Sequence, residues 1–204
     1  MEFLFLLKII LMDKTTFLKI IQSDTQKLKH RDILLNACLN NTSWASFLLT
    51  NMKSVDNENS NVSARILELS CKENIEIIIP YLDFFCELLN KVKLNGVIRV
   101  CSKICELLMI EYFVNKNHKI MNSLQNEHLE KIIEAGFIWM ITDQKIAVQA
   151  YTMQTLFLLG TKFDWIHNEL AIIIEKNIPT GSTGYKNRGR KVLRAIETST
   201  NLKL

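Results

Sequence analysis

Residues 65–71 read RILELSC, and residues 99–105 read RVCSKIC. Each segment begins with an arginine, continues with mostly apolar residues and ends with a cysteine, and the two are offset by 34 residues. A third, weaker match, QAYTM at residues 149–153, follows at a longer interval. Self-similarity at such a period predicts stacked structural repeats. The polar stretch 115–126 accounts for the longer interval and is interpreted as an inserted loop.

Apolar residues recur at three- and four-residue spacing on both sides of these segments, which is typical of amphipathic helices. Each repeat is therefore interpreted as a helical hairpin that buries its apolar stripe only by stacking on its neighbours. The predicted fold is all-α, a right-handed α-α superhelix (a HEAT/ARM-like solenoid) of stacked helical hairpins. The predicted helices are 14–28, 30–39, 43–54, 62–72, 80–92, 96–114, 126–141, 144–160, 165–176 and 183–198.

The composition is that of one globular domain. Of the 204 residues, 48% are hydrophobic and 23% are charged, which excludes a disordered chain. Two prolines and six glycines are too few turn residues for a sandwich or barrel of many short strands. Residues 13–204 are predicted to form a single all-helical repeat domain. Residues 1–12 are interpreted as a mis-assigned or disordered extension, since a polar cap at Asp13 follows Met12.

The pattern over residues 62–198 resembles the HEAT-like and armadillo-like helical-repeat superfamily, with residues 13–54 as a degenerate capping repeat. This resemblance implies a scaffold that binds other macromolecules.

A second resemblance lies in the C-terminal third. Residues 150–166 and the segment GYKNRGRKVL at residues 184–193 are similar to small bacterial helical proteins often labelled adenylosuccinate lyase. Lyases of that family carry a signature loop with Met-Pro and Asn-Pro dipeptides, neither of which occurs in this sequence. No catalytic residue is therefore assigned, and a lyase-type enzyme is retained as a third hypothesis.

The cysteines are odd in number and lie within apolar helical segments, without the spacing of a disulfide framework or a Cys-x-x-Cys metal motif. We expect them to pack in the core of a cytoplasmic protein. No cofactor or metal ligand set is predicted. No membrane association is predicted either, because the apolar opening of about ten residues falls short of the roughly 20 that a membrane-spanning helix needs.

Two further groups are assigned structural roles. Arg65 and Arg99 occupy equivalent positions in the repeat, with Glu68 and Glu106 nearby, and we expect internal salt bridges. Four aromatic residues lie beside aliphatic residues at helical spacing, and we expect them to pack in the core, with a ligand groove as the alternative. These aromatic residues are Trp44, Trp139, Tyr151 and Trp165.

The charge is concentrated at the C-terminal end. Residues 179–204 hold six cations and one anion, a net charge of +5, whereas the whole chain carries +4. If residues 183–198 form one helix, a basic stripe lies along it, with Tyr185, Val192, Leu193 and Ile196 facing the body. The candidate binding residues of this stripe are Lys186, Arg188, Arg190, Lys191 and Arg194.

These features favour a non-catalytic helical-repeat scaffold that binds a macromolecular partner, with a protein as the favoured partner. The alternative is weak nucleic-acid binding through the basic stripe, as the resemblance to HEAT-like DNA alkylation repair proteins implies, because cations that meet phosphates release counterions. A terminal capping helix with a solvated polar face explains the same stripe without a partner. The oligomeric state is left open.

Overall fold

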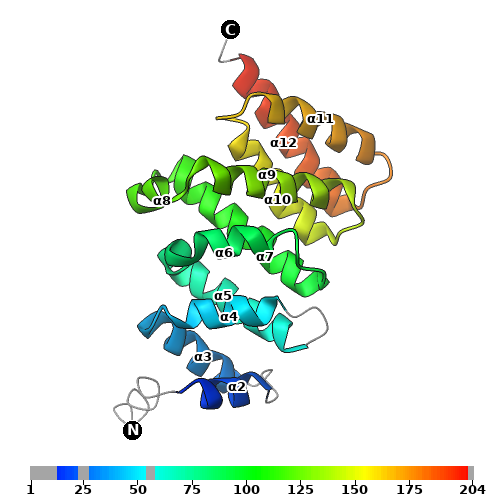
Figure 1. Cartoon of the computed structure of the whole chain (residues 1–204). Coiled ribbons are helices and arrows are strands. Elements are labelled where there is room, and N and C mark those ends of the chain that lie inside the picture. Colours follow the sequence, from blue (N-terminus) through cyan, green and yellow to red (C-terminus); the bar gives the residue numbers. More distant parts are fainter. Residues whose placement is uncertain (1–12, 23–27, 54–57, 202–204) are drawn as a thin grey trace. The chain divides into compact units, whose positions relative to one another are not determined.

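The computed structural model describes residues 13–22, 28–53 and 58–201, and that part of the chain contains helices and no strand (Figure 1). The all-α prediction is therefore confirmed. The predicted extension, residues 1–12, lies outside the described residues. The helices are α2 (Lys14–Gln22), α3 (Leu28–Asn40), α4 (Trp44–Met52), α5 (Glu58–Glu73), α6 (Leu82–Leu88), α7 (Asn95–Met109), α8 (His118–Ser123), α9 (Asn126–Ile141), α10 (Ile146–Leu159), α11 (Trp165–Asn177) and α12 (Thr183–Asn201).

The chain divides into two compact units, Met1–Cys101 and Ser102–Leu204, and the division falls within α7. In the first unit, α5 packs against α3 and α4. Its apolar core extends to α2 through an aromatic cluster, in which the rings of Phe17 and Trp44 stack with centroids 4.2 Å apart and Phe47 meets Phe17 edge-on. The start of α2 is fixed by Asp13, whose Oδ1 accepts a hydrogen bond of 2.7 Å from the Thr16 amide.

A 3-10 helix, Ile75–Tyr81, leads into α6. The side chain of Asn74 caps it by accepting a hydrogen bond from the Glu76 amide at 3.0 Å. The predicted helix 80–92 is therefore wrong at its start: Pro80 lies near the end of the 3-10 helix, and α6 begins after it. The buried residues Ile75, Ile77 and Ile78 are too closely spaced for one stripe of an α-helix, which agrees with this tighter turn.

In the second unit, α10 packs against α9, α11 and α12 (Figure 1). Because α10 has neighbours on several sides, its buried residues occur all around it and include Thr152 and Thr155 as well as aliphatic residues. Gly136 allows α9 to approach closely, since a Cβ at this position would stand 3.0 Å from Leu156 on α10.

The interpretation of residues 115–126 as a loop is wrong in part. The end of α7 continues as a π-helical segment, Ile110–Val114, and α8 follows within the polar stretch. The Asn117 side chain caps α8 by accepting hydrogen bonds from the amides of Lys119 and Ile120. Within α8 only Ile120 is buried, so the helix has no apolar periodicity that the sequence could reveal.

Candidate functional site

Helix α12, which carries the basic stripe, is seated on α10 and α11 by one apolar face. The prediction that four apolar side chains face the body is confirmed for Tyr185, Val192 and Ile196, which are buried, whereas Leu193 is half-buried. Gly189 lies among them, and a Cβ there would stand 2.8 Å from Cγ2 of Ile174 on α11, closer than real Cβ atoms approach. A glycine at this position therefore lets the two helices come into contact.

Four of the five candidate cations lie away from this apolar face. Arg190, Lys191 and Arg194 are exposed, and Lys186 is half-buried. Within residues 13–22, 28–53 and 58–201, none of the four has an acidic partner in an ion pair. These four residues are called the α12 stripe below, and their positive charge is presented to solvent.

The fifth candidate, Arg188, is directed toward the body of the second unit. Its Nη2 lies 3.2 Å from Oε1 of Glu106 on α7, and its Nε donates to the carbonyl oxygen of Ala150 on α10 at 3.2 Å. Nζ of Lys103 also forms an ion pair with the Glu106 carboxylate, at 2.7 Å. The same ammonium group lies 4.7 Å from the centre of the Tyr151 ring. Arg188 thus holds α12 against α7 and α10, a structural role that the other four cations lack.

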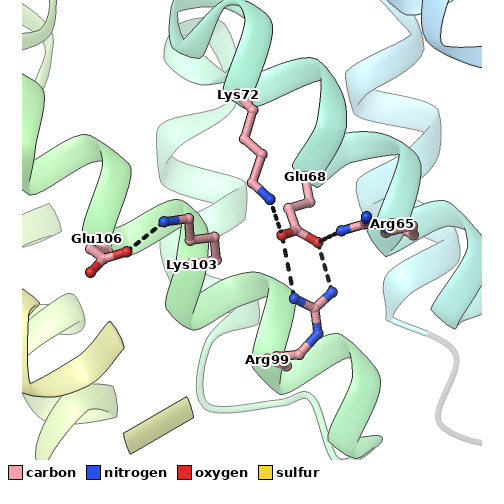
Figure 2. A network of polar contacts seen from close by, with 6 residues as sticks. All are labelled: Arg65, Glu68, Lys72, Arg99, Lys103 and Glu106. Carbon is pink, nitrogen blue, oxygen red and sulfur yellow. Dashed lines mark hydrogen bonds and ion pairs between the residues drawn. The ribbon is translucent and has the colours of Figure 1, made fainter. Parts of the chain in front are cut away.

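In the first unit, three cations converge on the carboxylate of Glu68, whose side chain is fully buried (Figure 2). Arg65 and Lys72 reach it from the same helix, α5, at 2.7 Å and 2.8 Å. Arg99 reaches it from α7, with Nη2 at 2.7 Å from Oε2 and Nη1 at 3.3 Å from Oε1. The expected salt bridges of Arg65 and Arg99 are confirmed, and the two arginines, 34 residues apart in the sequence, share one carboxylate.

The environment of Glu68 keeps this carboxylate ionised. Burial by itself would raise the pKa of Glu68, but the hydrogen bonds from Arg99, Lys72 and Arg65 outweigh it and lower the pKa from 4.5 to about 2. Arg99 reaches this carboxylate from a second helix, so the cluster joins α7 to α5, and loss of one partner would leave buried charge unpaired. We therefore assign the Glu68 cluster a structural role.

All five cysteines are buried, which confirms that they pack in the core. Burial raises the pKa of the Cys38 and Cys101 thiols to about 12 in each case and also raises that of Cys71. Thiols with such pKa values carry little thiolate at neutral pH. No group of three or more potential metal-ligating side chains occurs in the part of the chain that the structure describes.

The expectation that the four aromatic residues lie in the core is wrong for Trp165. Trp44 and Trp139 are buried and Tyr151 is half-buried, but 53% of Trp165 is exposed. Its indole stacks on Phe137 of α9, with ring centroids 5.5 Å apart. The sequence around Trp165, with Asp164, Asn168 and Glu169, is more polar than that around Trp139, which lies between Ile138 and Met140.

Comparison with models of known protein families, with curated proteins and with solved structures finds no match. Among the described residues, no helix is both long enough and apolar enough to cross a membrane.

Proposed function

We propose that this chain is a non-catalytic helical-repeat module that binds a macromolecular partner, with its helices arranged as a HEAT/ARM-like array. The 34-residue offset between Arg65 and Arg99 supports the repeat, because these residues lie on α5 and α7 and both pair with Glu68. A shared ion pair between consecutive repeats is a contact that a stacked array uses to fix its spacing.

The observation that carries the binding function is the α12 stripe. Lys186, Arg190 and Arg194 follow one another at four-residue intervals, so their Cα atoms rise about 12 Å along the helix. One strand of a duplex presents a phosphate about every 3.4 Å of axial rise, so this length faces roughly three phosphates. Cations without acidic partners can neutralise phosphates without first breaking an ion pair. Nucleic acid is therefore the partner that this surface favours.

The stripe predicts binding that depends on charge and is indifferent to sequence. The described residues of α12 that face solvent include no large apolar group. The cations of the α12 stripe all lie on this one helix. Backbone phosphate contacts alone give non-specific dissociation constants of roughly 1–100 µM at physiological salt. The sequence pattern favours a protein as the partner, and a different surface, on α9 and α11, suits a protein.

The experiment compares two triple variants by fluorescence anisotropy with labelled DNA at low salt. Arg190, Lys191 and Arg194 are replaced by glutamine in the first variant, which we expect to bind at least about tenfold more weakly than the wild type. Lys93, Lys145 and Lys176, which are equally exposed, are replaced in the second, which we expect to retain affinity. Arg188 stays unchanged because it holds α12 in place. Equal losses in both variants would show that net charge alone matters, and the stripe would then have no special role.

A further inference from the structure

The second unit presents bulky apolar side chains to solvent on α9 and α11. The exposed fractions are 40% for Ile138, 69% for Ile141, 53% for Trp165 and 59% for Ile172. Isolated exposed apolar residues are ordinary, but a group of them on adjacent elements marks an interaction surface.

These side chains belong to one surface because the two helices touch there. Phe137 of α9 stacks on Trp165 of α11 with ring centroids 5.5 Å apart. Ile141 lies four residues after Phe137, and Ile172 lies seven residues after Trp165, so each follows the stacked pair along the same side of its helix. The four exposed residues Ile138, Ile141, Trp165 and Ile172 are called the α9–α11 patch.

The surroundings of the patch are acidic. Together α9 and α11 carry five glutamates and two lysines. Glu134 lies four residues before Ile138, and Glu169 lies four residues after Trp165, so both border the patch. Both carboxylates are exposed, and neither has a cationic partner within residues 13–22, 28–53 and 58–201.

We propose that the α9–α11 patch is the docking surface for a basic amphipathic helix of a partner protein. Apolar residues on one stripe of that helix cover Trp165 and the isoleucines, and lysine or arginine residues beside the stripe pair with Glu134 and Glu169. An amphipathic helix that lays its apolar stripe on a complementary surface is a common mode of peptide recognition. Charge complementarity around the patch sets the sign of the partner's charge.

A second copy of this chain is a poorer occupant. Its strongly basic element is α12, whose described exposed side chains are cations, one glutamate and uncharged polar residues, without a large apolar group. Such a surface can form ion pairs with Glu134 and Glu169, but it has no apolar side chains that would shield Trp165 and Ile141 from water. The partner must therefore supply cations and apolar side chains on the same face.

Trp165 provides the readout, since it is exposed while Trp44 and Trp139 are 7% and 4% exposed. The probe is a short helical peptide of leucine and lysine with leucines at helical spacing, and its counterpart has glutamate in place of lysine. We expect the lysine peptide to bind, to shift the Trp165 emission to the blue and to protect it from acrylamide quenching. We expect the glutamate peptide to bind at least about tenfold more weakly, because like charges oppose docking.

Variants separate the apolar contribution from the electrostatic one. Replacing Ile141 and Ile172 by glutamine leaves every charge in place and is expected to abolish binding, whereas V114Q, an equally exposed site outside the patch, is expected to retain it. Replacing Glu134 and Glu169 by lysine is expected to reverse the preference between the two peptides. All these positions are exposed, and circular dichroism checks that the variants fold.

Three results would overturn the proposal. The first is failure of the lysine peptide to shift Trp165 emission, and the second is binding that survives in the Ile141 and Ile172 glutamine variant. The third is self-association, seen by sedimentation of the wild type and lost in that variant, which would make a second copy the occupant.

Discussion

The guanidinium of Arg99 on α7 lies 2.7 Å from the buried carboxylate of Glu68 on α5, which also holds Arg65 and Lys72 (Figure 2). Arg99 is the one cation of this cluster that comes from another helix. The Arg99–Glu68 contact therefore joins α7 to α5, whereas Arg65 and Lys72 act within α5. Because the carboxylate is out of contact with water, it depends on these cations for its stability as an ion.

Replacement of Glu68 by glutamine is expected to destabilise the protein by about 3 kcal/mol, because it leaves three clustered cations without their counterion. The free energy of unfolding in urea measures this loss. The matched control is E87Q, whose exposed pair with Lys91 at 3.7 Å predicts a change within about 0.5 kcal/mol. Equal effects of the two substitutions would contradict the structural role of the Glu68 cluster.

The contribution of Glu68 to stability is expected to depend on pH. Its pKa is about 2 in the folded protein against an ordinary value of 4.5, so the folded state binds its proton less tightly than the unfolded state. The stabilisation is therefore fully present above about pH 5 and is lost as the pH falls toward 2. Urea unfolding of the wild type and E68Q between pH 6 and pH 2.5 checks this. Their stability difference should narrow at low pH, and a constant difference would argue against a depressed pKa.

Arg188 and Arg190 should behave in opposite ways although they are two residues apart. Glutamine at position 188 removes the ion pair with the buried carboxylate of Glu106 and is expected to cost about 1–2 kcal/mol. Glutamine at position 190, which is exposed, is expected to change stability by less than about 0.5 kcal/mol and to weaken DNA binding. Thermal melting and anisotropy of both variants check this separation. An R188Q protein as stable as the wild type would contradict the structural role of Arg188.

The cysteines are expected to be unreactive in the folded protein, because burial raises the pKa of Cys38 and Cys101 to about 12. A thiol-specific chromogenic reagent at pH 8 should titrate almost no thiol in the native state and all five in urea. Addition of a chelator should leave the native result unchanged. Fast native reaction, or thiols exposed by the chelator, would contradict their packing role.

The sequence predicts the helical class and most helices because apolar periodicity is strong in α5, α7, α9 and α12. It fails at α8, where Ile120 is the only buried residue and the start signal, Asn117, lies in a run of polar residues. It also fails near Pro80, because a proline suits both the first turn of an α-helix and a 3-10 turn.

The candidate site is predicted in part. Charge density along the sequence identifies the cations of α12, but only the packing of α12 on α10 separates Arg188 from its neighbours. The same limit applies to Trp165. Helix α11 carries apolar residues on more than one side, so periodicity does not reveal which side the neighbouring helices leave exposed.

The most direct test of the account is the salt dependence of nucleic-acid binding, measured by fluorescence anisotropy with single-stranded DNA, double-stranded DNA and RNA. We expect three or four cations of the α12 stripe to contact phosphates. The logarithm of the association constant for duplex DNA should then fall with the logarithm of the salt concentration with a slope near −3. The R190Q/K191Q/R194Q variant should bring this slope to about −1, because Lys186 remains. Absence of binding at low salt, or a slope that the variant leaves unchanged, would contradict the assignment of α12 as the binding surface.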